Sequence, residues 1–372
     1  MNINVHAIET AVPGKGYAQD YIRSFMMEHV ARSRFSRLAI QRIYSRSGIQ
    51  RRHSTISEFG DPPEDGLFYD ASTQQIRNPP TGDRNQRYQT EASALAVPMA
   101  ERLVSESAFS RDEITHVVTA SCTGFFAPGL DWLLIRELGL SPQTESYHLG
   151  FMGCYAAFPA LRLAQDIAAH SPDAVILIVC VELCSLHLQF TEEVDDLLSA
   201  SLFADGAAAA LVSAQPPRRV GPVLEIAALD SDRTPAGESE MTWAIGNHGF
   251  DMELTPEVPK YIEKYLPYTL ARLQAAGYDG SNTDVWAVHP GGRAILDAVQ
   301  RVAHLSEESL QASITTLRDY GNMSSATIWF VLKNVMAGMS KESVPIMMMA
   351  FGPGLTIETG RATARLHREG NT

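Results

Sequence analysis

The sequence has little positive charge, few cysteines and no long apolar run. Its 372 residues include 30 Lys and Arg against 43 Asp and Glu, which gives a formal net charge of −13. This balance argues against an extended basic surface for nucleic acid or for an anionic membrane. No window reaches the roughly 18 uninterrupted apolar residues that a membrane-spanning helix needs. We therefore expect no membrane span, and any anionic substrate must be met by a local basic patch.

The cysteines and the N-terminus indicate a cytoplasmic protein. The first residues lack the positive start and the apolar run of a secretory signal. Four cysteines are too few for a disulfide scaffold in a chain of this length, so we expect free thiols. Cys180 and Cys184 are separated by three residues, but they lie in or beside an apolar, strand-like run, and no second ligand pair occurs. Packing explains these two cysteines better than a metal site does.

The hydrophobic pattern predicts a layered α/β fold. A chain of this length with 45% hydrophobic residues can bury a full core, which favours two domains or two fused halves over one small module. Apolar runs alternate with amphipathic segments, as strands and helices do in such a fold. The predicted strands span residues 115–121, 174–181, 207–212, 285–288 and 343–351, and predicted helices span 130–138 and begin near 154 and 294.

Two proline-rich segments suggest how the chain is organised. Gln-Pro-Pro at 215–217 follows a predicted strand, so we place a boundary there between an N-terminal half, 1–216, and a C-terminal half, 217–372. Residues 60–86 are rich in Pro, Gly, Asp and Asn, which is typical of a long surface excursion with little regular structure.

Cys154 is a candidate nucleophile. It stands in Gly-Phe-Met-Gly-Cys-Tyr-Ala-Ala (150–157), in the first turn of a predicted helix with an apolar face. Small residues on both sides let a substrate approach the backbone. The N-terminus of a helix, assisted by a histidine, lowers a thiol pKa from about 8.5 to roughly 3.5–7.5. The alternative is a small buried hydrophobe, the usual fate of a free cysteine.

Two further polar residues follow late in the chain. His289 ends a predicted strand and begins His-Pro-Gly-Gly (289–292), a turn from which a side chain can point into a cleft. Asn322 lies in Tyr-Gly-Asn-Met-Ser-Ser-Ala (320–326), just before an apolar helix. A lone histidine is more often structural than catalytic, and an ordinary helix N-cap is the simpler interpretation of Asn322 and Ser324. Taken singly, these residues leave the function open.

Taken together, the motifs resemble the type III polyketide synthases, the chalcone-synthase-like enzymes of the thiolase fold. The resemblance spans about residues 40 to 360, in the family's order. The matching segments are Gly-Cys-Tyr-Ala (153–156), Leu-Phe-Ala-Asp-Gly-Ala-Ala-Ala (202–209), His-Pro-Gly-Gly (289–292), Tyr-Gly-Asn-Met-Ser-Ser-Ala (320–326) and Phe-Gly-Pro-Gly-Leu-Thr-Ile-Glu (351–358). Each segment is a weak signal alone, but together they are specific. The resemblance implies a thiolase-like layered αβαβα fold of two similar halves and a homodimer.

The resemblance also implies the catalytic chemistry. Cys154, paired with His289 as an imidazolium, takes the starter acyl group from CoA as a thioester. His289 and Asn322 then donate hydrogen bonds to the thioester carbonyl of malonyl-CoA and stabilise the enolate left when carbon dioxide is lost. The enolate attacks the acyl-cysteine, and the cycle can repeat. The substrates are CoA thioesters, and no metal or redox cofactor is needed.

Further positions are assigned by the same resemblance to the cavity that shapes the product. Phe203 lies between the CoA tunnel and the cavity and helps to orient malonyl decarboxylation. Its partner gatekeeper falls on Met252 instead of an aromatic residue, and whether Phe250 on the same strand face replaces it stays open. Trp243 takes the place of a glycine at the cavity wall and blocks one direction of growth. Ala127 falls where plant enzymes send a methionine across the dimer interface, and it could open another route for an alkyl chain.

Other segments concern the starter and CoA. Residues 181–187 resemble those of bacterial members that make alkylresorcinols and alkylpyrones from long fatty acyl starters. Arg42 and Arg46 match basic residues that hold CoA phosphates, whereas a third basic position falls on Ala39 and is lost; a solvated helix face is the alternative. Ordinary packing is the alternative for the cavity positions. The remaining substrate-binding candidates are Cys122, Thr123, His187, Ser324, Gly352, Pro353 and Gly354.

The leading hypothesis is an enzyme that elongates a fatty acyl-CoA iteratively with malonyl-CoA and releases a cyclised pyrone or resorcinol. A nearer alternative is a single-condensation ketosynthase that depends on an acyl carrier protein. A non-catalytic acyl-binding protein with the same fold is the alternative from another class. A thiolase would need a second catalytic cysteine late in the chain, and none follows Cys184.

Overall fold

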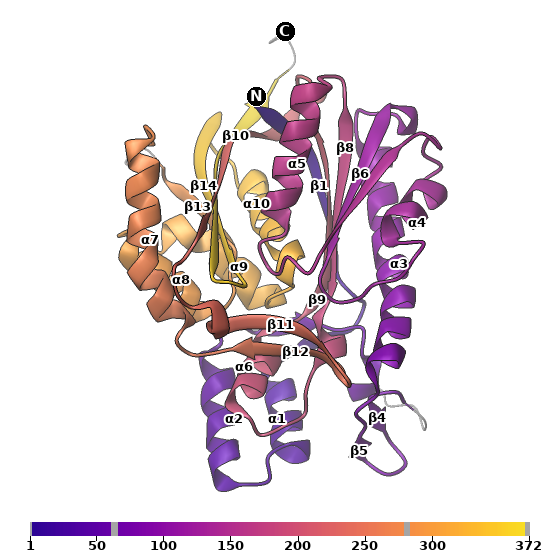
Figure 1. The fold of residues 1–372 in the computed structure, drawn as a ribbon, viewed down its shortest axis with the longest axis vertical. Coiled ribbons are helices and arrows are strands. Elements are labelled where there is room, and N and C mark those ends of the chain that lie inside the picture. Colours follow the sequence, from indigo (N-terminus) through magenta and orange to yellow (C-terminus); the bar gives the residue numbers. More distant parts are fainter. Residues whose placement is uncertain (1, 61–65, 279–282, 369–372) are drawn as a thin grey trace.

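The centre of the molecule is a nine-stranded sheet, shown in the computed structural model of Figure 1. The structure describes residues 2–60, 66–278 and 283–368. The strands follow the order β13 (Val285–Val288), β14 (Ser343–Gly352), β15 (Thr356–His367), β10 (Gly221–Arg233), β1 (Ile3–Ala11), β9 (Asp205–Ser213), β8 (Val175–Leu183), β6 (Ile114–Ser121) and β7 (Glu145–Gly150). β1 pairs antiparallel with β9 on one side and with β10 on the other, so it joins two arms of the sheet.

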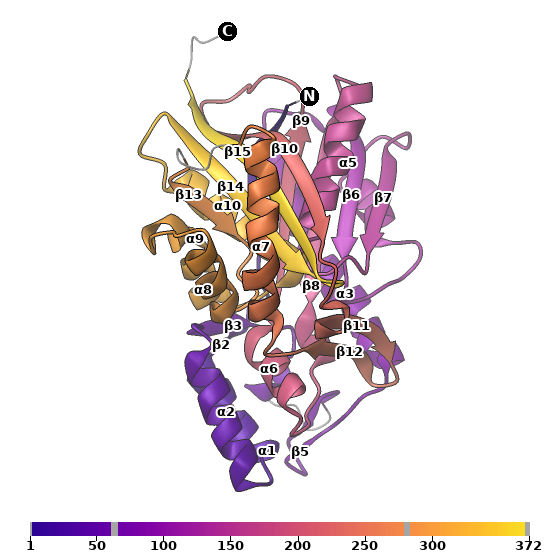
Figure 2. The ribbon, with the colours of Figure 1, turned by 60° about the vertical axis from the view of Figure 1, so that its left-hand side comes forward.

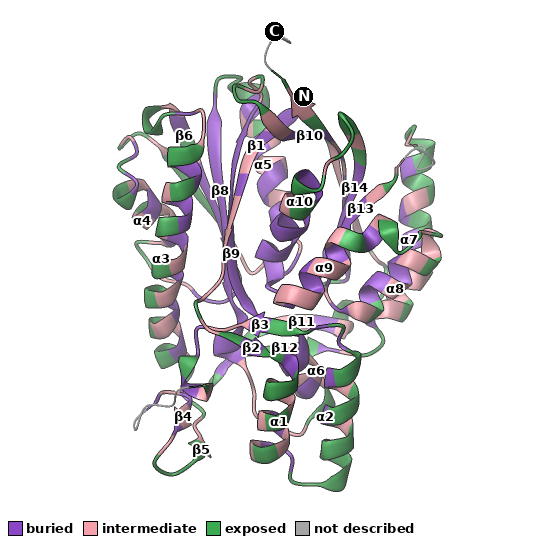
Figure 3. Ribbon diagram, turned by 180° about the vertical axis from the view of Figure 1, so that it is seen from behind, coloured by how far each residue is buried: buried purple, intermediate pink, exposed green. Residues whose placement is uncertain are grey.

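Helices form three layers around the two arms (Figures 1 and 3). The central layer holds α5 (Ala157–His170) and α10 (Thr327–Ala337), with α9 (Gln311–Tyr320) packed beside α10. The outer face of the β6–β8–β9 arm is covered by α3 (Thr81–Glu106) and α4 (Leu130–Glu137). The side of the β13–β14 arm is covered by α7 (Val258–Ala275) and α8 (Arg293–Val302). The layers therefore alternate as helix, sheet, helix, sheet, helix.

Packing of β8 shows why its sequence is a continuous apolar run. All nine of its residues are buried. Ile176, Ile178 and Cys180 belong to the central core with α5 and α10. Val175, Leu177 and the other alternate residues belong to the core under α3 and α4. Successive strand residues point to opposite faces, so a strand covered on both sides must be apolar throughout, as the sequence predicted.

Smaller elements lie beyond one end of the sheet, at the bottom of Figures 1 and 2. They are α1 (Gln19–His29), α2 (Arg34–Arg46), α6 (Val194–Leu202) and three hairpins: β2 (Gly16–Ala18) with β3 (Arg51–His53), β4 (Tyr69–Asp70) with β5 (Gln75–Ile76), and β11 (Met241–Gly246) with β12 (Gly249–Leu254). β7 and β13 both end toward these elements, so the turns that follow them meet there. No helix in the described parts of the chain is long and apolar enough to cross a bilayer.

The prediction of an irregular excursion over residues 60–86 is wrong at its C-terminal end. The long helix α3 already begins at Thr81, directly after Pro80. The cause is tertiary, because the guanidinium of the buried Arg84 donates to the carbonyl oxygens of Pro79 and Leu186 and fixes the first turn. The Asp-Pro-Pro at 61–63 lies outside the described residues.

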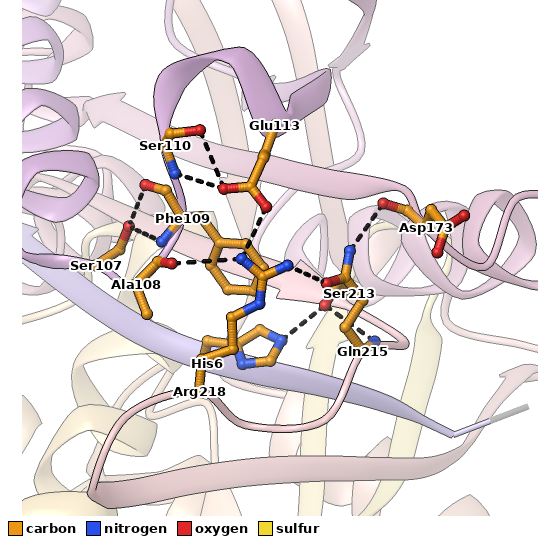
Figure 4. Close-up of polar contacts among 10 residues, drawn as sticks. All are labelled: His6, Ser107, Ala108, Phe109, Ser110, Glu113, Asp173, Ser213, Gln215 and Arg218. Atoms are coloured by element: carbon orange, nitrogen blue, oxygen red, sulfur yellow. Dashed lines mark hydrogen bonds and ion pairs between the residues drawn. The ribbon is translucent and has the colours of Figure 1, made fainter.

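The segment that follows β9, with its two prolines, is tied to the N-terminal part of the sheet (Figure 4). Gln215 donates through Nε2 to the carbonyl oxygen of Asp173 at 2.9 Å. The guanidinium of Arg218 donates to Glu113 at 2.7 Å and lies 4.4 Å from the centre of the Phe109 ring. The connection is therefore held against the body of the protein and is not a loose linker.

Candidate active site

Cys154 lies in a tight turn between β7 and α5. The turn contains Gly153, whose φ of +79° lies in the left-handed region that favours glycine. A Cβ at this position would also collide with the ring of Pro353. The Gly153 amide donates to the Cys122 Sγ at 3.0 Å and ties the turn to the end of β6. Cys154 precedes the first residue of α5, Ala157, so the predicted place in the first helical turn is wrong by about one turn.

Burial determines the protonation state of Cys154 in the free protein. The side chain is only 7% exposed, and its desolvation raises the thiol pKa to about 11. Hydrogen bonds from Ser324 and Asn322 oppose this increase but do not cancel it. The sequence-based expectation of a lowered thiol pKa is therefore wrong, because burial in the fold outweighs the field of the helix.

His289 follows β13, and its backbone amide donates to the Met349 carbonyl at 2.7 Å. The imidazole is 1% exposed, and neither ring nitrogen has a hydrogen-bond partner in the described part of the chain. Desolvation lowers the His289 pKa to about 3, so the ring is neutral. The site thus holds a neutral thiol and a neutral imidazole. Formation of a thiolate requires proton transfer from Cys154 to His289, which their mutual attraction then stabilises.

Asn322 presents its amide group to the sulfur. The Oδ1 atom accepts from the Ser324 backbone amide at 2.9 Å, whereas Nδ2 lies 3.3 Å from the Gly291 carbonyl oxygen and 4.0 Å from the Cys154 Sγ. Oδ1 also lies 4.0 Å from the Cys154 Sγ, so both amide atoms adjoin the sulfur, and Nδ2 is the one that can donate a hydrogen bond. The backbone of Asn322 forms a β-bridge with Phe203, which holds both residues beside the cavity. Because the N-cap of α10 is Ala326, the N-cap interpretation of Asn322 and Ser324 is wrong.

These residues line one cavity of about 280 Å³, here called the main cavity. Its wall includes five predicted site residues: Cys154, Phe203, Met252, His289 and Asn322. Most other lining side chains are apolar, among them Leu198 and Phe351. Ile43 of α2 also contributes, so the cavity extends to the helix that carries Arg42 and Arg46. A nucleophile, a base and an amide donor in an apolar cavity can perform acyl transfer.

A side cavity of about 30 Å³ lies behind Phe203 and Met252, which line both spaces. It contains the predicted pocket residues His187 and Trp243, together with Cys184. His187 is neutral, because burial lowers its pKa to about 4. Its Nε2 donates to the Thr123 carbonyl at 2.7 Å, and its Nδ1 accepts from a backbone amide. His187 is therefore a fixed part of the wall.

Trp243 and Phe250 close this wall. The Trp243 indole donates to the Cys122 carbonyl at 2.7 Å. Phe250 stacks on His187 with ring centres 4.1 Å apart and is absent from the lining of both cavities, whereas Met252 faces both. Phe250 is therefore packed within the wall and lines neither of these two cavities.

The other predicted positions lie outside the main cavity lining. Pro353 and its glycine neighbours support the Cys154 turn, since the Tyr155 ring packs against Gly352. Ala127 is exposed beside α4. Arg42 and Arg46 are exposed one turn apart on α2. Within residues 2–60, 66–278 and 283–368, no group of three or more His, Cys, Asp or Glu side chains is placed to hold a metal ion.

Glu182 is a residue that the sequence reasoning missed. Its fully buried carboxylate accepts from the Cys122 amide and the Thr123 hydroxyl, both at 3.0 Å, and from the Ser325 hydroxyl. It thereby connects the end of β6 to the segment that carries Asn322. The signal was present, because Glu182 is the one charged residue in the apolar run of β8, and a buried carboxylate is retained only with hydrogen-bond partners.

Substituting Glu182→Gln should remove a pH-dependent contribution to stability. Burial raises the Glu182 pKa to about 7 from 4.5. Between these values the unfolded chain loses a proton that the folded chain retains, so the wild type is destabilised as the pH rises. From pH 5.5 to pH 8 this loss is about 2 kcal/mol. Thermal unfolding at the two pH values should show a smaller decrease in Tm for the variant. The exposed Glu308→Gln is the matched control, and equal decreases in all three proteins would contradict the assignment.

Comparison with known proteins agrees with this geometry. Residues 2–216 match the family model described as chalcone and stilbene synthases, N-terminal domain, and residues 225–362 match the model of the C-terminal domain. The alpha-pyrone synthesis polyketide synthase-like protein Pks18 of Mycobacterium tuberculosis is 33% identical over 327 residues, which are 86% of this chain and 80% of that protein.

Solved structures share the whole fold. PKS-I from the brown alga Ectocarpus siliculosus superimposes with a TM-score of 0.89 at 29% identity and covers 98% of both chains. The 1,3,6,8-tetrahydroxynaphthalene synthase of Streptomyces coelicolor A3(2), a bacterial type III polyketide synthase, gives a TM-score of 0.86 at 26% identity, over 98% of this chain and 99% of that one. The predicted thiolase-like layered fold is confirmed.

Proposed function

Because the chain belongs to the chalcone and stilbene synthase family of type III polyketide synthases, we propose that it extends an acyl-CoA starter iteratively with malonyl-CoA and releases a cyclised alkylpyrone or alkylresorcinol. Members of the family are acyltransferases that use CoA thioesters as substrates. The observation that carries the proposal is the convergence of Cys154, His289 and Asn322 on one apolar cavity. The name of the relative Pks18 favours the pyrone.

The first step in this proposal loads the starter. The Cys154 thiol transfers its proton to His289, and the sulfur attacks the thioester carbonyl of the acyl-CoA. Collapse of the tetrahedral intermediate breaks the bond to CoA, which leaves as a thiolate, while the acyl group remains on Cys154. Entry of the substrate displaces water from the cavity. Burial disfavours a thiolate or an imidazolium on its own, but it strengthens the attraction between the two when both are formed.

The second step forms the carbon–carbon bond. His289 and the Asn322 Nδ2 donate hydrogen bonds to the thioester oxygen of malonyl-CoA. Loss of carbon dioxide leaves the electron pair as an enolate, which these donors stabilise. The enolate carbon attacks the acyl-cysteine carbonyl and releases the Cys154 thiolate, so the elongated chain is now attached to CoA. Transfer of this chain back to Cys154 starts the next cycle.

The cavities support a starter with a long alkyl chain. A main cavity of about 280 Å³ lies just below the roughly 300–1,000 Å³ typical of ligand sites, so a long chain needs further space. Behind it, the side cavity shares Leu188, Ala200 and Phe203 with a third, apolar cavity of about 50 Å³. Rotation of Phe203 and of the flexible Met252 would join these spaces, and we propose that the alkyl chain extends along this route.

The proposed CoA site lies on α2. Arg42 and Arg46 stand one turn apart and flank Ile43, which lines the main cavity. Both guanidinium groups are exposed, so they are free to meet the phosphates of CoA while the pantetheine arm enters beside Ile43. Ala39, one turn further, supplies no third charge.

Purified protein incubated with a panel of acyl-CoA starters and labelled malonyl-CoA should give products that mass spectrometry resolves by starter, extension number and cyclisation. We expect long-chain starters to give triketide or tetraketide pyrones or resorcinols. The absence of condensation products with every starter would refute the proposal. A single condensation that requires carrier-protein thioesters would instead support the ketosynthase alternative.

The location, oligomeric state, cofactor need and carrier of the enzyme are also part of the proposal. We propose that the enzyme is a cytoplasmic homodimer, that it needs no metal or redox cofactor, and that an acyl carrier protein is a second possible donor of the starter. We also propose two similar halves that meet at residues 216 and 217; the limits of the two family models, 216 and 225, support this division.

A further inference from the structure

The hairpin of α1 and α2 projects from the body of the protein, and its far end is the lowest part of the molecule in Figures 1 and 2. At this end two large apolar side chains are open to solvent, Phe35 at 71% and Leu38 at 61% exposure. They stand one turn apart on α2 and alternate with Arg34 and Arg37, which are also exposed. We call these four residues the basic tip.

The basic tip is positively charged in a chain whose net charge is −13. α2 contains four arginines, at 34, 37, 42 and 46, and no acidic residue. The described residues offer none of these guanidinium groups an ion pair, whereas exposed arginines elsewhere, such as Arg111 and Arg301, are paired with glutamates. The Glu192 carboxylate near the tip accepts backbone amides of the α1–α2 loop. The exposed face of α2 is therefore locally basic, although the whole chain carries a net negative charge.

The tip is also preorganised. Ser33 caps α2 with a capping box, in which its hydroxyl accepts from the Ser36 amide at 3.0 Å. The opposite face of the helix is anchored by the buried Ile40 and Tyr44. The capped helix thus holds Phe35 and Leu38 exposed to solvent. Exposure of neighbouring apolar side chains to water is unfavourable, and it points to a binding partner.

CoA does not account for the tip. Phe35 precedes Ile43, at the cavity, by eight residues, which corresponds to about 12 Å along the helix axis. The proposed phosphate ligands Arg42 and Arg46 lie close to Ile43, so they leave Arg34 and Arg37 without a role in substrate binding. Phe35 and Leu38 lie between arginines at a projecting end of the molecule. A protein partner would need a pocket complementary to this end, whereas a lipid surface can deform around it.

We propose that the basic tip docks the enzyme on anionic lipid bilayers. Phe35 and Leu38 enter the interface between headgroups and acyl chains, and the arginines contact lipid phosphates. In this orientation α2 holds Ile43, and with it one wall of the main cavity, about 12 Å along the helix from the docked Phe35. The further role, collection of acyl substrates that partition into the membrane, rests on the proposed function; the docking itself does not.

Co-sedimentation with lipid vesicles tests the docking. Wild-type protein should bind vesicles of phosphatidylcholine mixed with phosphatidylglycerol, and should bind pure phosphatidylcholine much less. High salt should weaken the binding, since it screens exposed charges. Phe35→Ser/Leu38→Ser and Arg34→Glu/Arg37→Glu should each lower the bound fraction on the order of tenfold. The matched control is Ile245→Ser/Tyr268→Ser, which removes side chains of 66% and 71% exposure from other surfaces and should bind as the wild type does.

Three outcomes would overturn the proposal: wild type that does not bind anionic vesicles, tip variants that bind as well as wild type, or an acidic carrier protein that binds the tip while vesicles do not. Condensation of soluble short-chain acyl-CoA in vesicle-free buffer should persist in both tip variants. Vesicle binding without condensation by the wild type would refute the proposed function and leave the docking intact.

Discussion

Cys154→Ala should abolish formation of the acyl-enzyme and of every condensation product. All four cysteines lie in the described part of the chain, and Cys154 is the one that lines the main cavity. The methyl group of alanine cannot form a thioester, and no other cysteine of the described residues lines the cavity with His289 and Asn322. The reaction has no covalent route without it, so we expect a loss of product on the order of 10⁴-fold or more.

Intact-protein mass spectrometry after incubation with an acyl-CoA alone measures the loading step directly. The wild type should gain the mass of one acyl group, and Cys154→Ala should gain none. Cys180→Ala is the matched control, because its thiol is buried in the central core and accepts a hydrogen bond from the Trp329 indole at 3.3 Å. Cys122→Ala should also acquire the acyl group. Acylation of Cys154→Ala at the wild-type level would disprove the role of Cys154.

Strand positions and the three polar residues could be predicted from the sequence because they depend on local patterns. The apolar run that became β8 and the short run that became β13 lie within a few residues of the predicted ranges. The end of a strand followed by small residues placed His289 correctly at a turn, and the position predicted for Cys154 was about one helical turn off. Spacing in the sequence does not show that Cys154, His289 and Asn322 share one cavity. That prediction came from the resemblance of the combined motifs to a known family.

The pKa values of the site residues could not be predicted from the neighbouring sequence. The pKa of Cys154 depends on its burial among apolar side chains from distant segments, such as Leu202 and Val258. The same applies to His289, whose imidazole is buried in the packed fold without a hydrogen-bond partner among the described residues. A helix N-terminus was visible in the sequence, but the desolvation that outweighs it was not, since it arises only from the packed fold.

The shape of the cavity also escaped local reasoning. Phe250 and Met252 share a strand face, and only the structure shows that Phe250 packs on His187 while Met252 faces the cavities. The start of α3 was hidden by turn-forming residues that tertiary hydrogen bonds from Arg84 override. In each case a contact between segments far apart in the sequence decided the outcome.

Asn322→Asp should reduce decarboxylation of malonyl-CoA by on the order of 10²–10³-fold, because it replaces one hydrogen-bond donor to the enolate by an acceptor. The amide orientation supports this expectation: both amide atoms lie 4.0 Å from the Cys154 Sγ, but Oδ1 accepts from the Ser324 amide, and Nδ2 is the atom that can donate. In the variant the Ser324 contact can persist, while the second carboxylate oxygen takes the place of Nδ2. Its negative charge would then repel the forming enolate. The release of labelled carbon dioxide from malonyl-CoA measures this step without a starter.

The same variant separates the two half-reactions. An acyl-CoA starter should still load on Cys154 in Asn322→Asp, although more slowly, because the proton acceptor His289 is retained and the new charge disfavours the thiolate. The matched control is Asn247→Asp, which makes the same change at an exposed residue of the β11–β12 turn and should release carbon dioxide at the wild-type rate. Equal loss of loading and decarboxylation would mean that Asn322 acts mainly by positioning Cys154. A decarboxylation defect much larger than the loading defect would show that the amide acts on the malonyl thioester, which is the role that its fixed orientation favours.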